Sequence, residues 1–419
     1  MKMSSSNDGK QLDHIKNILT FDEITEIAKN ITNDKSVQVL NCNLNDLTNE
    51  KLGFTGTHHI LTIIVQKPNA KKRETISAFV KIASLDLEGF DESIDINSFI
   101  TGRESFLLNT LVSQFEKDCK SEKWCPIHYY TSKNAVIMEN LKWHGYRIIE
   151  EFIDDQKVLK SVLASLARFH SCSILTETRM SQEMKRPISL NEHYKDKFQE
   201  LVFIKTGEAS SWFESVTKLT CALAEHFGFD SVKVRELFDR ACDIIKPSEI
   251  HRNVVCHGDI HSKNLMFADN SPLLKCILID FQTYRYAPMV TDILEFLHNN
   301  TTSKFREEHE ASLVEFYHSI LVDTIKSNDS TNNVKIPSLE DIFTGMKDLR
   351  LFGLVIACIY YPILFLDPEL LKKHARDAEF NKNLVSGDRI ELTFSQMEVN
   401  PFYKSKIEEA IRELIEKGA

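Results

Sequence analysis

The sequence lacks several features that would restrict its class of function. Its nine cysteines are scattered, without a CxxC pair or a regular framework, which predicts reduced, mostly buried thiols and a cytoplasmic location. The first residues, MKMSSSNDGKQLDH, contain no apolar stretch, so we expect no secretory signal. The sequence also has no internal repeat or low-complexity tract.

Long apolar runs and excess positive charge are missing as well. The longest apolar run, at residues 351–366, is shorter than the ~20 residues that cross a bilayer, and Pro362 interrupts it. We therefore expect a buried helix there and no membrane span. With 51 Lys and Arg against 61 Asp and Glu, the net charge of −10 argues against nucleic-acid binding but allows a local site for one nucleotide. The composition does not specify an oligomeric state.

The order of patterns along the 419 residues predicts two packed lobes. Residues 1–36 are expected to form an N-terminal extension with one helix, and residues 37–138 a small β-rich lobe with one further helix. Residues 139–150 connect this lobe to a large, mostly helical lobe at residues 151–419. The expected fold class is α+β.

Three segments of the first lobe have the β-branched, partly alternating pattern of strands: VQVLNCNL, HHILTIIVQ and TISAFVKIA. The charged stretch KPNAKKRE between the last two predicts a hairpin loop. Apolar residues at helical spacing predict a helix over residues 98–115, and two short strands are expected near residues 127–130 and 135–138.

The strongest chemical signal lies in the segments VVCHGDIHSKNLMF and ILIDFQ of the second lobe. The first contains Asp259 and Asn264 at the D-x-x-x-x-N spacing of a kinase catalytic loop, here residues 257–264. The second ends an apolar strand in Asp280, which corresponds to the metal-binding aspartate of a DFG-type turn, here residues 280–282.

This pattern fits phosphoryl transfer from ATP. The nucleotide carries several negative charges that a divalent cation must neutralise, and Mg²⁺ prefers oxygen ligands, so Asn264 and Asp280 are the predicted metal ligands. Asp259 is the predicted catalytic residue, which orients the acceptor hydroxyl and receives its proton. The expected cofactors are ATP and Mg²⁺.

Two other interpretations of the same segment stay open. Asp and Asn are common turn residues, so Asp259 and Asn264 could make loop hydrogen bonds alone. His257, Asp259 and His261 form an HxDxH pattern that suits zinc, although no second histidine cluster with ligand spacing is present.

The first lobe contains candidate residues for the nucleotide. Lys81 lies in the strand segment AFVKIA, and Glu104 on the following helix can pair with it to position the α- and β-phosphates. Each residue alone could also be an ordinary surface charge. Gly53 and Gly56 in LGFTGTHH are candidates for a phosphate-covering loop, with an ordinary hairpin turn as the alternative.

The sequence resembles the ecdysteroid kinase-like family, which is related to the CHK-kinase-like group and grouped with aminoglycoside phosphotransferases and choline kinases. The resemblance covers residues ~37–300 and implies a two-lobed protein-kinase-like fold. Its matching stretches are FVK, RESFLL, IMENLKWHGY, LARFHS, HGDIHSKNLMF and ILIDFQTYRYAPMVTDILEFL.

The resemblance implies further roles. Glu139, Asn140 and Leu141 would form the hinge that meets the adenine, and Asp292 would brace the catalytic loop, through His257. Many insect members have Trp at the position of His261, which leaves the acceptor side of the site open. Gln282 replaces the Gly of DFG, which suggests no protein-kinase-style Phe flip.

The expected acceptor is a small molecule, because no APE segment follows Asp280 to position a peptide. The resemblance implies a hydroxylated apolar acceptor such as an ecdysteroid or a xenobiotic alcohol. A choline- or aminoglycoside-type acceptor is the alternative. A catalytically inactive nucleotide- or ligand-binding protein is a further one, and the presence of Lys81, Asp259, Asn264 and Asp280 argues against it.

Overall fold

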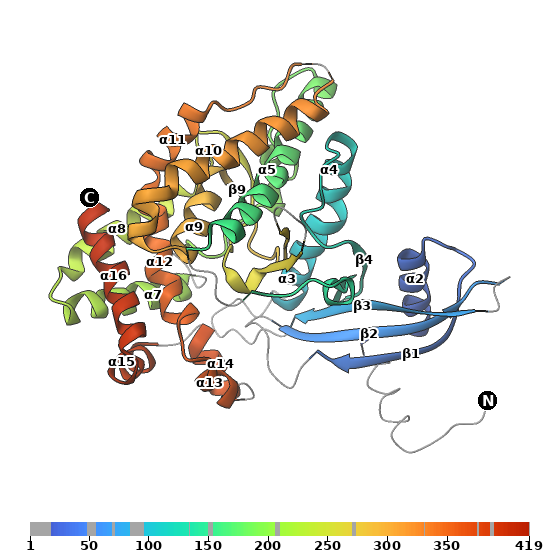
Figure 1. Ribbon diagram of the computed structural model, residues 1–419, viewed down its shortest axis with the longest axis horizontal. Coiled ribbons are helices and arrows are strands. Elements are labelled where there is room, and N and C mark those ends of the chain that lie inside the picture. The colour runs from blue at the N-terminus through green and yellow to red at the C-terminus, as the bar shows by residue number, and fades with distance from the viewer. Residues whose placement is uncertain are drawn as a thin grey trace. The chain divides into compact units, whose positions relative to one another are not determined.

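The computed structural model describes residues 18–47, 56–68, 72–83, 96–133, 135–149, 154–205, 210–269, 274–330, 332–374, 377–385 and 389–418. The chain separates into two compact units (Figure 1). The first unit consists of residues 1–86, 92–110 and 125–147, and the second of residues 87–91, 111–124 and 148–419.

The first unit is built on one antiparallel sheet with the strand order β1-β2-β3-β5-β4. The predicted hairpin loop joins β2 and β3, whose pairing runs from Gln66 opposite Arg73 to Gly56 opposite Ala83. The strands are β1 (Gln38–Asp46), β2 (Gly56–Gln66), β3 (Arg73–Ala83), β4 (His128–Thr131) and β5 (Ala135–Glu139).

Alternation along these strands buries one face of the sheet. In β2, every second side chain is buried, including Leu61, Ile63 and Val65. Helix α2 (Phe21–Thr32) packs in the same apolar cluster through Ile24 and Ile27. It starts with a capping box in which Thr20 and Glu23 satisfy each other's backbone N–H groups.

The helix predicted over residues 98–115 is longer and interrupted. It consists of α3 (Ile96–Ser105), the π-helical segment η1 (Phe106–Leu111) and α4 (Val112–Asp118). Helix α3 contacts strands β3 and β5 of the first unit, whereas α4 packs against α5 of the second. The chain therefore passes from one unit to the other within this helical segment.

The second unit is mostly helical and contains two short antiparallel two-stranded sheets, which pair β6 with β9 and β7 with β8. The strands of these sheets are β6 (Asn253–Cys256), β7 (Leu265–Ala268), β8 (Lys275–Leu278) and β9 (Arg285–Pro288). The longer helices are α5 (Gln156–Met184), α7 (Ser211–His226), α8 (Ser231–Ile244), α9 (Val290–Asn300), α10 (Ser303–Asn328), α11 (Leu339–Asp348), α12 (Arg350–Leu364), α15 (Ile390–Val399) and α16 (Pro401–Lys417). The short helical segments are η2 (Leu141–His144, in the first unit), α6 (Leu190–His193), η3 (Lys195–Lys197), η5 (Ser262–Asn264), α13 (Pro368–Lys373) and α14 (Ala378–Val385).

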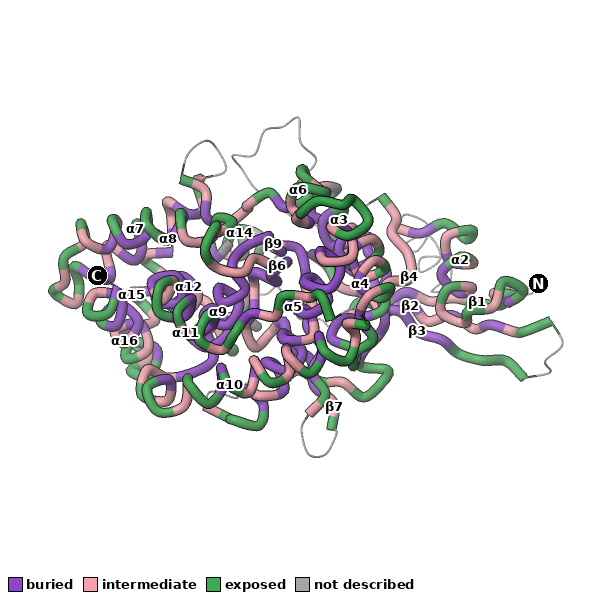
Figure 2. The backbone as a smooth tube through the Cα atoms, turned by 90° about the horizontal axis from the view of Figure 1, so that it is seen from above, coloured by how far each residue is buried: buried purple, intermediate pink, exposed green. Residues whose placement is uncertain are grey.

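Three buried helices form the centre of the second unit. Every residue of α9 is buried, and α9 is coloured as buried along its length in Figure 2. Helix α5 is long and apolar enough to cross a membrane by length and composition, but 89% of its apolar window is buried inside the protein, so it is a core helix. The apolar run at residues 351–366 forms α12, a buried helix as predicted.

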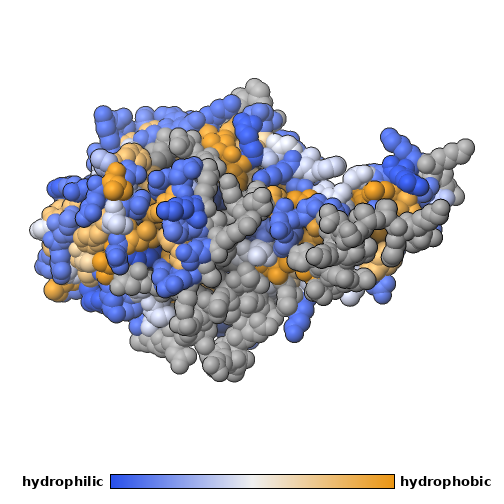
Figure 3. All heavy atoms as spheres, turned by 90° about the horizontal axis from the view of Figure 1, so that it is seen from below, coloured by the Kyte–Doolittle hydropathy of each residue, from blue (hydrophilic) through white to orange (hydrophobic). Residues whose placement is uncertain are grey.

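The β-rich first unit followed by a mostly helical second unit confirms the predicted α+β, protein-kinase-like fold. On the face shown in Figure 3, hydrophilic side chains are interspersed with small hydrophobic areas among the described residues.

Candidate active site

The two small sheets of the second unit bring the predicted catalytic segments together. Residues 257–264 run from β6 to β7, and residues 279–284 run from β8 to β9. Because β6 pairs with β9, the start of the first connection lies beside the end of the second. Because β7 pairs with β8, the end of the first connection lies beside the start of the second. The N–H of Ile279 donates to the carbonyl of Asn264 at 3.0 Å, which fixes the two segments side by side.

Asp259 lies in the loop 257–264 with its side chain 13% exposed. Its two carboxylate oxygens have different partners. Asn264 Nδ2 donates to Oδ2 at 2.9 Å, and the hydroxyl of Tyr360 donates to Oδ1 at 2.7 Å. His261 Nε2 lies 3.4 Å from the same Oδ1. The carboxylate is therefore oriented by donors from the loop itself and from α12.

The side chains of Asn264 and Asp280 contain oxygen atoms, which are the ligands that Mg²⁺ prefers. The Asn264 amide donates through Nδ2 to the backbone carbonyl of Asp259 at 3.0 Å and to its carboxylate, so its oxygen atom faces away from those contacts. Asp280 follows Ile279, which is bonded to the Asn264 carbonyl, and has φ of +68°. An amide oxygen and a carboxylate on two neighbouring segments fit a hard cation, and these two residues would hold it.

One face of α9 holds the backbone of the catalytic loop. Asp292 accepts from the backbone N–H of His257 at 2.7 Å and of Gly258 at 3.1 Å. Glu295 Oε1 accepts from the N–H of Ile260 at 2.9 Å. Asn299 Nδ2 donates to the Ile260 carbonyl at 3.4 Å. These three α9 residues are spaced i, i+3 and i+7, so they lie on the same side of the helix.

Asp292 was expected to brace the loop through His257. The structure shows that the contact uses the backbone of His257, whereas its ring is directed elsewhere. His257 Nε2 donates to the carbonyl of Ile279 at 3.0 Å, and Nδ1 accepts from the N–H of Asp259 at 3.3 Å. The ring therefore links the catalytic loop to the turn that bears Asp280.

Asp292 and Glu295 differ in ionisation although both are buried. Burial would raise the pKa of Asp292, but the hydrogen bond from His170 Nε2 at 3.1 Å and the N–H of His257 hold that pKa below its usual value. Burial raises the pKa of Glu295 to about 8, against the opposing charge of Arg285. Asp292 is thus an anionic brace, and Glu295 is largely protonated at neutral pH.

Gly258 is required by the geometry of the loop. Its φ is +77°, and a Cβ atom there would lie 2.6 Å from the carbonyl oxygen of Thr283. Arg285 Nη2 donates to the Gly258 carbonyl at 3.2 Å. Any larger side chain would push the loop away from the turn that follows β8.

The zinc interpretation does not fit this geometry. Both ring nitrogens of His257 are engaged by backbone groups, which leaves no lone pair on this ring for a metal. Within the described residues, the group of potential ligands that do converge is His170, Cys256 and Asp292. Burial raises the pKa of the Cys256 thiol, which makes hydrogen bonds to the carbonyls of Ala287 and Pro288, so this group is a buried hydrogen-bonded cluster.

The predicted nucleotide residues lie in the first unit. Lys81 Nζ and Glu104 Oε2 form an ion pair of 2.9 Å between β3 and α3, with the side chains 7% and 2% exposed. Gly56 is the first residue of β2 and is buried within the sheet, so it lies in a strand and not at a loop apex. Gly53 lies outside the described residues. A phosphate-binding role for any of them stays a prediction.

The predicted hinge residues have side chains engaged within the first unit. Glu139 ends β5, and its Oε2 accepts from the N–H of Ile127 at 3.1 Å. Asn140 caps the short helix η2 and donates to Ser77 Oγ at 2.8 Å. Leu141 is buried. Their contact with adenine stays a prediction.

Several residues around the site were not predicted from the sequence. Glu295 and Asn299 could have been found from the polar residues at helical spacing in the apolar segment VTDILEFLHNN. His170, Arg285 and Tyr360 have no such local signal, because their partners lie far away in the sequence.

Comparisons with known proteins agree with the resemblance seen in the motifs. The profile described as the ecdysteroid kinase-like family matches residues 53–329. No curated protein matches the chain.

Several solved structures are similar at low sequence identity. The gentamicin complex of APH(2″)-IIa is 14% identical, with 99% of this chain and 97% of that chain covered and a TM-score of 0.33. The GDP and kanamycin complex of APH(2″)-IIIa is 10% identical, with 91% and 100% covered and a TM-score of 0.38. A putative aminoglycoside phosphotransferase from Ralstonia eutropha is 11% identical, with 93% and 98% covered and a TM-score of 0.37.

Proposed function

The chain belongs to the ecdysteroid kinase-like family, and from this membership we propose that it is an ATP-dependent kinase that phosphorylates a hydroxyl group of a small molecule. The observation that carries the proposal is the arrangement around Asp259. Its carboxylate is oriented by Asn264 at 2.9 Å, and Asn264 is bonded in turn to the segment that presents Asp280.

In the proposed reaction, Asp259 accepts a hydrogen bond from the acceptor hydroxyl and receives its proton as transfer proceeds. The acceptor oxygen forms a bond to the γ-phosphorus, while the bond to the β–γ bridging oxygen breaks and ADP leaves. Mg²⁺ held by Asn264 and Asp280 would neutralise phosphate charge. The backbone contacts from Asp292 and Glu295 keep the loop in place during this step.

Lys81 is the proposed ligand of the α- and β-phosphates. An unpaired lysine buried to this extent would tend to lose its proton, and the ion pair with Glu104 counteracts that tendency. The pair also restricts the rotamers of the lysine side chain, so that less ordering is needed when nucleotide binds.

The proposed acceptor is a hydroxylated apolar molecule, of the ecdysteroid or xenobiotic type. Family membership is the main support for this class.

A direct test is to incubate the protein with Mg·ATP and single alcohols from a panel of ecdysteroids, hydroxylated xenobiotics, choline and aminoglycosides. Mass spectrometry then detects the phosphorylated alcohol, and ADP is measured in parallel. We expect a phosphorylated ecdysteroid or xenobiotic and loss of turnover when Mg²⁺ is chelated. Phosphorylation of choline or an aminoglycoside alone would overturn the acceptor class. Nucleotide binding without transfer to any alcohol would favour an inactive binding protein.

A further inference from the structure

Tyr360 contacts the proposed catalytic carboxylate and lies outside the family motifs. It lies in α12, beyond the residues 53–329 that match the family profile. Its hydroxyl donates to Asp259 Oδ1 at 2.7 Å across 101 residues of sequence. The carboxylate that would receive the acceptor proton is therefore contacted by a side chain from a separate helix.

The two carboxylate oxygens of Asp259 accept hydrogen bonds from two different side chains. Asn264 occupies Oδ2 and Tyr360 occupies Oδ1, so the carboxylate cannot rotate about its last bond without losing one of two charge-assisted hydrogen bonds. Each oxygen has two lone-pair sites, which leaves acceptor capacity for an incoming hydroxyl. Tyr360 occupies one lone-pair site of Oδ1, and this contact fixes the direction of the second site.

Tyr360 can orient Asp259 because α12 is itself held firmly. The hydroxyl of the neighbouring Tyr361 donates to the carbonyl of His298 in α9 at 2.8 Å, and Tyr403 of α16 donates to the carbonyl of Pro362 at 2.9 Å. Gly353 lies so close to the His298 ring that a Cβ atom would be 2.4 Å from Nδ1. Helix α12 thus packs closely on α9, the helix that also holds the catalytic loop.

We propose that Tyr360 is a positioning residue for phosphoryl transfer, which fixes the orientation of the Asp259 carboxylate toward the acceptor hydroxyl. This inference rests on the proposed function of Asp259 as proton acceptor. It extends the site to α12 and assigns a role to a residue whose ring, 5.8 Å from that of His261, could otherwise be taken as packing alone.

The Tyr360→Phe variant tests the proposal because it removes the hydroxyl and keeps the ring. A hydrogen bond to a charged group is typically strong enough that its loss lowers kcat by about ten- to a hundredfold. The KM for ATP should stay unchanged, because the hydroxyl that is removed donates to Asp259. Turnover is measured as ADP release with the best alcohol of the panel, and also as ATP hydrolysis without alcohol.

The matched control is Tyr361→Phe. It removes a phenolic hydroxyl from the next residue of the same helix, where the partner is a backbone carbonyl of α9. This variant should lose some thermal stability but much less kcat than Tyr360→Phe, because the contacts at Pro362 and Gly353 still hold α12. If both variants lose kcat in proportion to their loss of stability, Tyr360 has only a structural role and the proposal is overturned.

A double variant separates positioning from an independent effect. If Tyr360 acts through Asp259, adding Tyr360→Phe to Asp259→Asn should change turnover much less than it does in the wild type. Additive losses, or a Tyr360→Phe variant with unchanged or raised kcat, overturn the inference and leave the proposed function intact. Absence of turnover in the wild type overturns both.

Discussion

Asp259 lies in the loop 257–264, and Glu295 contacts the backbone of that loop, but the two carboxyl groups have different environments. Asp259 is partly exposed and accepts hydrogen bonds from side chains of Asn264 and Tyr360. Glu295 is fully buried, and burial raises its pKa to about 8. Glu295 therefore holds the Ile260 N–H with little charge, whereas Asp259 is the proposed proton acceptor.

The raised pKa of Glu295 predicts a pH-dependent stability. Its pKa in the folded chain lies above the ordinary value of 4.5, so the folded state binds more protons than the unfolded state between about pH 4.5 and 8. The free energy of unfolding should therefore fall as pH rises through this window, by up to about 1.4 kcal/mol per pH unit from this group. The Glu295→Gln variant keeps an oxygen for the Ile260 N–H and cannot ionise.

Denaturant unfolding of both proteins at several pH values measures the effect, because other titrating groups cancel in the difference. Glu295→Gln should match the wild type near pH 4.5 and become the more stable protein toward pH 8. A constant difference across this range would show that Glu295 has an ordinary pKa in the folded chain.

At the residue scale, local spacing in the sequence was enough to predict that Asp259, Asn264 and Asp280 lie on adjoining segments, because the strands on either side of the two short connections pair with each other. It could not select Tyr360, whose contact with Asp259 spans 101 residues and arises only when α12 packs on α9. Nor could it show that Asp292 holds the backbone of His257 and not its ring.

At the scale of elements, α3 and β3 are linked by the Lys81–Glu104 pair. Both side chains are almost completely buried, so the loss of either one would leave the other without its partner in the interior. Strand β3 and the presence of a helix near Glu104 followed from the alternation and spacing of apolar residues. The π-helical segment η1 did not, because the expected spacing of an α-helix continues on both sides of it.

The Lys81–Glu104 pair predicts that the effects of the two single substitutions on ATP binding do not add. Lys81→Ala should weaken ATP binding and turnover, and Glu104→Ala should weaken them through the same lysine. Because the two residues would act as a unit, the double variant should lose much less free energy of ATP binding than the sum of the two single variants. Calorimetry with Mg·ATP on the four proteins measures the coupling, and fully additive losses would assign the residues to independent roles.

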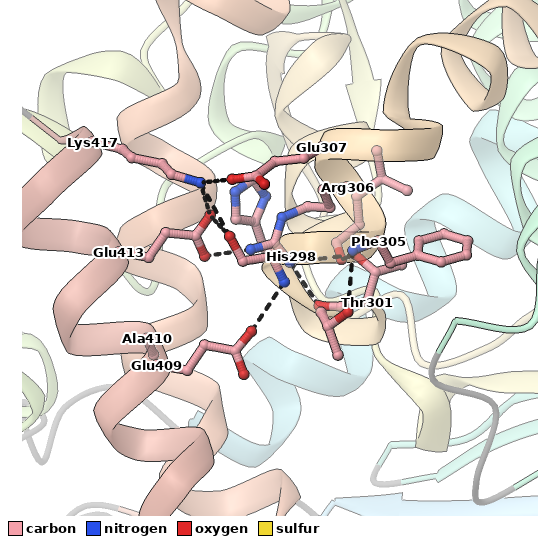
Figure 4. A network of polar contacts seen from close by, with 12 residues as sticks. His298, Thr301, Phe305, Arg306, Glu307, Glu409, Ala410, Glu413 and Lys417 are labelled. Carbon is pink, nitrogen blue, oxygen red and sulfur yellow. Dashed lines mark hydrogen bonds and ion pairs between the residues drawn. The ribbon is translucent and has the colours of Figure 1, made fainter.

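At the scale of the whole chain, a network of polar contacts joins the C-terminal helix α16 to α10 in the second unit. Figure 4 shows the network in which Arg306 of α10 contacts Glu413 of α16 and donates to the carbonyl of Thr301 at 2.6 Å. Lys417 reaches Glu413 at 3.2 Å and Glu307 at 2.8 Å at the edge of the same network. Arg306 is 4% exposed and Lys417 is 36% exposed.

Because Arg306 is more deeply buried than Lys417, we expect its substitution to lower the free energy of unfolding more. Arg306→Ala leaves a buried carboxylate without its main partner and should lower the free energy of unfolding by about 3 kcal/mol, the lower end for a broken buried pair, because Ser303 still donates to Glu413. Lys417→Ala removes a partly exposed pair and should cost about 1 kcal/mol or less. Chemical denaturation measures both, and equal losses would contradict the assignment of Arg306 as the main anchor.

The central claim for the whole molecule is that Asp259 receives the acceptor proton, and Asp259→Asn tests it most directly. The substitution keeps the shape of the side chain and removes its charge, while the proposed metal ligands Asn264 and Asp280 remain. Calorimetry with Mg·ATP should show an affinity near that of the wild type, and turnover with the best alcohol should fall by roughly 10²–10⁴. A folded Asp259→Asn protein that binds Mg·ATP and turns over near the wild-type rate would contradict the account.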